Sequence, residues 1–265
     1  MGTLPLTRIS AEDRLSPVRE LPRYGGLLYF LIWRDVKVRY KQTTLGVLWA
    51  LIQPAGLIAA STLAFSRIAP GHVPYPYFVA AGVVPWLFFS RAVTDGAGSA
   101  VENERLLTKV YFPRLLLPLS AVIAVLVETA IAFIPVIAVT ANWTWRLFMI
   151  FPAMGVAIAT AIGISSAAAA MNVRYRDARY VIPFMVHIMF LLTPVLYPPR
   201  VVPERWRDLL AVNPLYGVLE TVRWSLFGSG PLPNSFVPAA AISAGLLLLG
   251  IWIFRASEDA FADVI

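Results

Sequence analysis

The sequence predicts an all-α membrane protein with six transmembrane helices, an N-terminal amphipathic interface helix and an external re-entrant helical hairpin. The 265-residue chain is 58% hydrophobic and only 14% charged, with a mean hydropathy of +0.71, whereas soluble proteins carry about 25% charged residues. Six apolar runs approach the roughly 20 residues that a helical span needs. Because these runs do not alternate with a period of two, a closed β-barrel is excluded.

The N-terminal segment differs in composition from the rest of the chain. Residues 1–23 are basic and contain three prolines, and they lack the apolar core of a signal peptide. We expect a flexible cytoplasmic arm over 1–23 and a single transmembrane domain over 24–265. The sequence contains no cysteine, which excludes disulfides and thiolate metal sites.

Residues 24–43 predict a helix that lies in the membrane interface. At 100° per residue, Tyr29, Trp33, Val36 and Tyr40 fall on one stripe. Aromatic side chains suit the headgroup layer, and cations suit anionic lipid. The cations flanking the stripe are Arg34, Lys37, Arg39 and Lys41. A bend is expected near Thr43, and a purely anchoring helix remains the alternative.

Six predicted spans follow, and the basic residues orient them. The spans cover 45–65, 74–93, 115–141, 147–171, 180–197 and 236–254. With the N-terminus inside, 16 of the 22 Lys and Arg residues lie on the cytoplasmic side. We therefore expect both termini in the cytoplasm. This placement explains the net charge of +7 by membrane topology, and no nucleic-acid partner is expected.

Residues 203–228 predict a helical hairpin on the outer side. Its second part, 215–227, is apolar but has only 13 residues, too few for a span. Glu220 and Arg223 are spaced for pairing on one helical face. The hairpin is either a gate at the exit of a pathway or an amphipathic loop that caps the bundle.

Two other polar features are candidates for function. Glu128 lies near the middle of the third predicted span, where a carboxylate is expensive and is often functional. The alternative is a carboxylate that is protonated or hydrogen-bonded to a neighbouring helix for packing. In the inside loop, residues 101–111 predict a short mixed-charge helix that either docks into a partner or is a solvated turn.

Motifs for catalysis are not found. No lysine stands in a GxxxxGK[ST] phosphate loop. His72 and His187 have no carboxylate at metal-ligand spacing, so no metal site is expected. The sequence supports neither an enzyme nor a cofactor bound by this chain.

Four stretches together resemble a known family. They are 33–54 (WRDVKVRYKQTTLGVLWALIQP), 104–114 (ERLLTKVYFPR), 172–184 with 193–198 (NVRYRDARYVIPF and TPVLYP), and 254–265 (FRASEDAFADVI). They resemble the membrane permease subunits of type-2 ABC exporters for polysaccharides and polyol phosphates, which export O-antigen, capsule or wall teichoic acid chains. The resemblance covers nearly the whole chain from about Tyr24.

The resemblance implies a function for the chain as a whole. It implies a multi-pass permease of the bacterial cytoplasmic membrane that moves a polyprenyl-pyrophosphate-linked glycan. The permease would form a homodimer with two ATP-binding subunits, which hold ATP and Mg.

The resemblance also implies roles for particular residues. Residues 101–111 would be the coupling helix, with contacts from Glu102, Glu104, Arg105 and Lys109. The cations Arg34, Lys37, Arg39 and Lys41 would lie near the ATP-binding subunit and the lipid pyrophosphate. The hairpin would be the external gate, with Glu220 and Arg223. The family often has an acidic residue after Phe-Pro-Arg, whereas this chain has Leu115.

A sugar polymer has apolar C–H faces, along which aromatic rings give broad sliding contacts. The candidate pathway rings are Trp49, Phe65, Tyr75, Tyr77, Trp86, Phe88 and Phe89; lipid contact or core packing is the alternative for each. Two other functions remain open: an ABC exporter permease for a lipid or small-molecule drug, and a membrane enzyme acting on polyprenyl-linked sugars. A purely structural scaffold is the fourth alternative.

Overall fold

The computed structural model describes residues 24–41, 43–68, 73–109, 112–140, 143–175, 177–228 and 230–258. The α-helices are α2 (Gly25–Tyr40), α3 (Trp49–Phe65), α4 (Tyr75–Glu102), α5 (Glu104–Lys109), α6 (Leu116–Thr140), α7 (Ile150–Arg174), α8 (Ala178–Leu192), α9 (Glu204–Val212), α10 (Pro214–Phe227) and α11 (Phe236–Ser257). The short 3₁₀ helices are η3 (Gly46–Leu48), η4 (Ser66–Ile68), η5 (Trp145–Met149) and η6 (Pro199–Val201). The predicted arm, 1–23, lies outside the described residues.

Helix α4 is the centre of the bundle. It packs against α3, α6, α7, α8 and α10, and 72% of its most apolar window is buried. Helices α7 and α11 pack closely because glycines replace larger side chains at their contact. A Cβ atom on Gly250 would collide with the backbone of Gly163, so both positions require a residue without a side chain.

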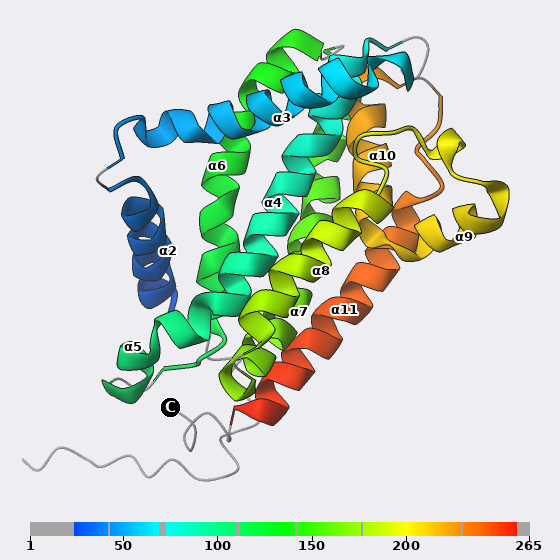
Figure 1. Ribbon diagram of the computed structural model, residues 1–265. Helices are drawn as coiled ribbons and strands as arrows, with labels where there is room; N and C mark the ends of the chain where they lie inside the picture. The colour runs from blue at the N-terminus through cyan, green and yellow to red at the C-terminus, as the bar shows by residue number, and fades with distance from the viewer. Residues whose placement is uncertain are drawn as a thin grey trace, which may run out of the picture.

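In the part of the chain that the structure describes, five helices are long and apolar enough to cross a membrane: η3–α3, α4, α6, η5–α7 and α11. The predicted span at 180–197 corresponds to the shorter helix α8, which ends at Leu192 after 15 residues. Figure 1 shows α3 crossing the bundle at a steep angle, whereas α4, α6, α8 and α11 run along it. Only 17% of the apolar window of α3 is buried, so little packing within the chain holds this helix against the bundle.

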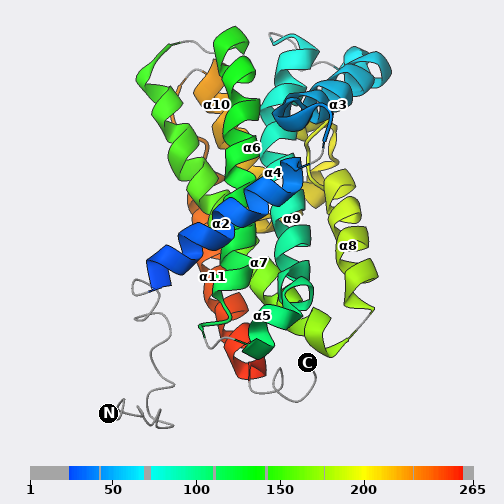
Figure 2. The same cartoon turned by 90° about the vertical axis from the view of Figure 1, so that its left-hand side faces the viewer.

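The two ends of the bundle carry different elements. Helix α5 and the end of α11 lie at one end, α2 lies beside the middle of the bundle, and α9 lies toward the other end (Figures 1 and 2). The Nη1 atom of Arg114, before α6, donates to the carbonyl of Glu258 at the end of α11, at 2.7 Å. We call the α5 end the inner end, following the predicted orientation, and the opposite end the outer end.

The interface helix forms as α2, and its buried face differs in part from the predicted stripe. Tyr29 and Trp33 are exposed, whereas Leu31, off that stripe, is fully buried. Leu31 packs against Phe112 and Leu116, so contact with the start of α6 determines the face. The predicted bend after α2 is confirmed, and Gly46 there has φ of 51°, a left-handed value that glycine adopts without strain.

The inside loop differs from its prediction. Helix α4 continues through Gly96 and Gly98 to Glu102, whereas the glycines were expected to precede a separate helix. Gly96 faces Ser165 of α7 so closely that a Cβ atom would collide with it, and tight packing therefore explains this residue. The predicted helix 101–111 begins at Glu104 as α5, and Glu102 belongs to α4; the last two residues of the predicted helix, 110 and 111, lie outside the described residues.

Candidate functional site

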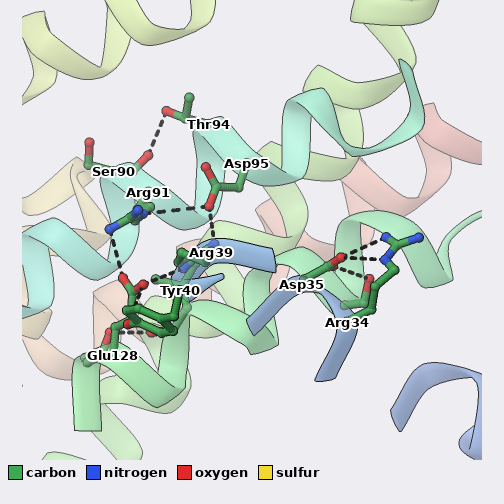
Figure 3. A network of polar contacts seen from close by, with 12 residues as sticks. Arg34, Asp35, Arg39, Tyr40, Ser90, Arg91, Thr94, Asp95 and Glu128 are labelled. Atoms are coloured by element: carbon green, nitrogen blue, oxygen red, sulfur yellow. Dashed lines mark hydrogen bonds and ion pairs between the residues drawn. The ribbon is translucent and has the colours of Figure 1, made fainter. Parts of the chain in front are cut away.

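A cluster of charged side chains joins α2, α4 and α6 halfway along the bundle (Figure 3). We call Arg39, Arg91, Asp95 and Glu128 the charge cluster. Arg39 is at the end of α2, Arg91 and Asp95 are one turn apart on α4, and Glu128 is in the middle of α6. Two guanidinium groups and two carboxylates balance within it.

The distances show that each charge has an opposite partner. Arg39 Nη2 lies 2.5 Å from Asp95 Oδ2, and Arg39 Nη1 lies 3.2 Å from Glu128 Oε1. Arg91 Nη1 donates to Glu128 Oε2 at 2.9 Å, and Arg91 Nε lies 3.9 Å from Asp95 Oδ2. Tyr40 adds a hydrogen bond, donating from its hydroxyl to Glu128 Oε1 at 2.7 Å. The carboxylate of Glu128 is therefore contacted from both α2 and α4.

Burial explains why these groups are paired. The side chains of Arg39 and Glu128 are only 15% and 11% exposed, and removing one partner of a buried ion pair costs roughly 3–5 kcal/mol. Burial, followed by the hydrogen bond to Glu128, raises the pKa of the Tyr40 hydroxyl well above its usual range. Tyr40 therefore stays protonated and donates to the carboxylate. Glu128 is ion-paired, and its hydrogen bonds from Tyr40 and Arg91 match the alternative of a carboxylate bonded to neighbouring helices.

Two cavities adjoin the charge cluster. One, of about 270 Å³, is lined by Gln53, Thr94, Glu128 and Thr129 among others. The second, of about 440 Å³, is lined by Arg34, Asp35, Arg39, Ser99, Glu102 and Asn103 among others. Arg91 and Asp95 line both cavities. The cluster therefore stands between two spaces that polar groups or water can enter.

The four predicted interface cations occupy two different environments. Arg39 is bound to two carboxylates, and Arg34 pairs with its neighbour Asp35 at 2.7 Å. Lys37 and Lys41 are exposed, and neither forms an ion pair with the described residues. The lysines can therefore meet an anionic headgroup without giving up a partner, whereas Arg39 cannot.

Helix α5 is attached to α2 through apolar side chains. Leu106 and Leu107 of α5 pack on the cluster that contains Leu31 of α2 and Phe112. Glu104 and Arg105 are exposed, and the side chain of Lys109 lies outside the described atoms. Helices α5 and α2 therefore share one apolar cluster at the start of α6.

The predicted pathway rings also divide into two groups. Trp49, Phe65 and Tyr77 are exposed. The other four rings, Tyr75, Trp86, Phe88 and Phe89, are at most 4% exposed and belong to the main core. Core packing accounts for these four in this conformation, so only the exposed rings are placed to meet a cargo.

At the outer end, the hairpin forms as α9 and α10, but its charges do not pair as predicted. Arg223 Nη2 donates instead to the carbonyl of Val195 at 2.8 Å, and the guanidinium carbon lies 3.7 Å from the centre of the Phe78 ring. Glu220 forms no ion pair with Arg223 in the described part of the chain. Most of α10 is buried, so this helix is part of the bundle, and its role as a gate or a cap stays a prediction.

Sequence reasoning missed the partners of Glu128. Arg91 was counted as a residue of the inside loop, Tyr40 was assigned to the stripe facing the headgroups, and Asp95 was given no role. A signal was present, because Arg91 and Asp95 are four residues apart and share one helical face. That signal required extending the second span past its glycines. In the described residues, no group of three or more potential metal ligands is found.

The fold and the site define a class: a multi-pass helical membrane protein whose inner-end helix α5 is linked through α2 to a charge cluster within the bundle. The sequence profile of the ABC-2 type transporter family matches residues 26–227. The chain belongs to this family. The expectation of a multi-pass protein of the bacterial cytoplasmic membrane is thereby confirmed.

Curated relatives match over nearly their full length. The chain is 31% identical to the O-antigen export system permease protein RfbA of Myxococcus xanthus, covering 94% of this chain and 98% of the relative. It is 28% identical to the protein of that name in Klebsiella pneumoniae, covering 90% and 95%. It is 22% identical to the polysialic acid transport protein KpsM of Escherichia coli, covering 87% and 93%. The resemblance to polysaccharide export permeases is confirmed.

Proposed function

We propose that the chain is the permease subunit of an ATP-driven exporter that moves a polysaccharide linked to polyprenyl pyrophosphate across the cytoplasmic membrane. Relatives named for O-antigen export and polysialic acid transport support the polysaccharide cargo; a teichoic acid is the alternative polymer. The permease works as a homodimer with two ATP-binding subunits, which hold ATP and Mg. The exposed apolar faces of α3 and α8 support assembly with a second copy.

One observation supports the coupling mechanism most directly: α5, α2 and the charge cluster form a continuous series of contacts. Helix α5, with Glu104, Arg105 and Lys109, docks on the ATP-binding subunit. Its leucines pack with Leu31 of α2, and Arg39 at the far end of α2 binds Asp95 and Glu128. ATP-driven movement of α5 thereby shifts α2 against α4 and α6.

The cargo contacts follow from the free charges and exposed rings. Lys37 and Lys41, together with Arg34, attract the lipid pyrophosphate, since charge-assisted contacts are stronger than neutral ones. Trp49, Phe65 and Tyr77 supply rings for the passing sugars. The hairpin α9–α10 forms the outer gate, in which Glu220 lines the outer part and Arg223 fixes α10 to the turn after α8.

Co-reconstitution of the chain with its co-purifying ATP-binding subunit tests this proposal. Vesicles are given a polyprenyl-linked glycan or a small apolar dye, and ATP-dependent movement of each is measured. We expect movement of the glycan and none of the dye. Movement of the dye alone would support the small-molecule alternative, whereas ATP-independent chemical change of the glycan would support an enzyme.

The docking role of α5 is tested in the same vesicles with Arg105→Glu and Lys109→Glu together. We expect a membrane-inserted protein that no longer moves the glycan, because the charges meeting the ATP-binding subunit are reversed. Arg205→Glu on α9, at the other end of the bundle, is the matched control. Normal transport by the double variant would refute docking through α5.

A further inference from the structure

An apolar groove of about 800 Å³ lies between α6 and the η5–α7 segment. Its walls include Phe133 and Ile137 from α6 and Phe151 and Ile158 from α7. Among the described residues, Thr129 and Thr144 are the only hydroxyl or charged side chains that line it. In Figure 2 the first turns of α7 stand apart from the outer half of α6, on the side of the bundle away from α8.

The groove faces the surroundings rather than the core. Phe148 and Phe151 are 71% and 73% exposed. Exposed rings of this kind on a membrane-spanning segment require an apolar neighbour. Water is a poor occupant, because two threonines cannot supply the two to four polar partners that each buried water needs.

The length of the groove matches one leaflet of a bilayer. On α6 it extends from Leu126 to Ile137, about 16 Å at the helical rise of 1.5 Å per residue. The hydrocarbon core is roughly 30 Å thick, so one leaflet contributes about half of that. The groove begins at the outer end of α6 and stops near the middle, beside Thr129.

The mouth of the groove has the composition of a membrane interface. Trp143 and Trp145 line it at the outer end and are 80% and 66% exposed. Tryptophans concentrate at the level of lipid headgroups. Apolar walls of leaflet length below two interfacial tryptophans suit one hydrocarbon chain anchored by its headgroup at the surface.

We propose that this groove is a binding site for one acyl chain of an outer-leaflet phospholipid. The bound chain contacts α6 next to the charge cluster, because Thr129 lines both the groove and the cavity beside Glu128. The site is separate from the cargo contacts proposed above and does not depend on them.

The absence of cysteine in the sequence allows a site-specific test. A Cβ atom on Gly155, which lines the groove, meets no atom within 4 Å. Gly245, on the exposed face of α11 and outside the groove, has equally open space. Gly155→Cys and Gly245→Cys are therefore matched positions for a thiol-attached benzophenone, in nanodiscs of phosphatidylethanolamine and phosphatidylglycerol.

After irradiation, intact-protein mass spectrometry measures phospholipid adducts. We expect several-fold more adduct at position 155 than at 245, retained after transfer to detergent. Adding Ala130→Trp, which fills the groove from α6, should reduce the yield at 155 to the control value. Equal yields at both positions, or a product with the mass of two chains, would overturn the proposal; the second result would assign the groove to another copy.

Discussion

In the inner half of the bundle, side chains bind side chains: α2 is joined to α4 and α6 by the charge cluster. In the outer half, two of the contacts that hold the turn after α8 go to backbone carbonyls. Tyr75 donates to the carbonyl of Leu196 at 2.7 Å, and Arg223 donates to that of Val195 at 2.8 Å. Asn213 also donates to the Thr193 hydroxyl at 2.8 Å. The turn after α8 is thus held by α4 and by both ends of the hairpin's second helix.

The difference indicates which half can rearrange. Arg91 is 38% exposed and lies between two cavities, so its partners can be exchanged for water or another anion. The guanidinium of Arg223 is buried and lines neither of these two cavities, so water in them cannot replace its carbonyl partner. We infer that α2 moves on the inner half while the outer turn stays fixed. The predictions below test this contrast from the largest expected effect to the smallest.

Removing the central carboxylate should have the largest effect. Glu128→Ala leaves Arg39 and Arg91 without their shared partner, which should lower the unfolding free energy by roughly 3 kcal/mol and abolish transport. Thermal unfolding in detergent and vesicle transport measure the two losses. Glu204→Gln on the exposed part of α9 is the control, and an equal melting temperature for Glu128→Ala and wild type would contradict the role of the cluster.

The contact between Arg223 and the turn after α8 should tolerate less added volume than the exposed surface of the bundle. A Cβ atom on Gly82 would lie 2.7 Å from Arg223 Nη2 and 2.9 Å from the carbonyl of Val195. Gly82→Ala should therefore destabilise the protein by about 1–3 kcal/mol. Gly155→Ala, which meets open space, should leave the melting temperature unchanged. Equal changes in melting temperature for both substitutions would show that the contact between Arg223 and Val195 is not tightly packed.

Substituting the exposed lysines of α2 should affect lipid binding, whereas substituting the ion-paired Arg39 should affect stability. Lys37→Gln with Lys41→Gln should weaken binding of the lipid pyrophosphate without lowering the melting temperature, because neither lysine has an ion-pair partner among the described residues. Arg39→Gln should lower the melting temperature, because two carboxylates lose their partner. Lipid binding is measured by native mass spectrometry, and unchanged binding by the double variant would favour the purely anchoring role of α2.

Much of the fold could be predicted because hydropathy and breaks in the helices are local properties of the sequence. The runs at 115–141 and 236–254 correspond closely to α6 and α11. The end of α4 was misplaced because Gly96 was read as a turn signal, whereas it allows close contact with α7. The steep angle of α3 was also not predicted, since crossing angles depend on packing between helices.

The site was harder to predict because its partners are distant in sequence. Glu128 is contacted by residues 37 and 88 positions away, and periodicity within one helix does not show which face of another helix it meets. The same limit explains why the contacts of Arg223 were predicted wrongly. Its spacing from Glu220 predicted an ion pair, but a carbonyl and an aromatic ring from other segments occupy its contacts.

The central claim, that α2 moves against the bundle while the outer turn stays fixed, can be tested with a reversible crosslink in each half. Asp35→Cys with Ser120→Cys joins α2 to α6 at a pair whose oxygens are 3.4 Å apart. Thr193→Cys with Asn213→Cys joins the outer contact. After bridging each pair with a short bis-thiosulfonate, ATP-dependent glycan transport is measured before and after reduction. The account predicts that the inner crosslink blocks transport until it is reduced and that the outer one does not; full transport with α2 crosslinked would contradict it.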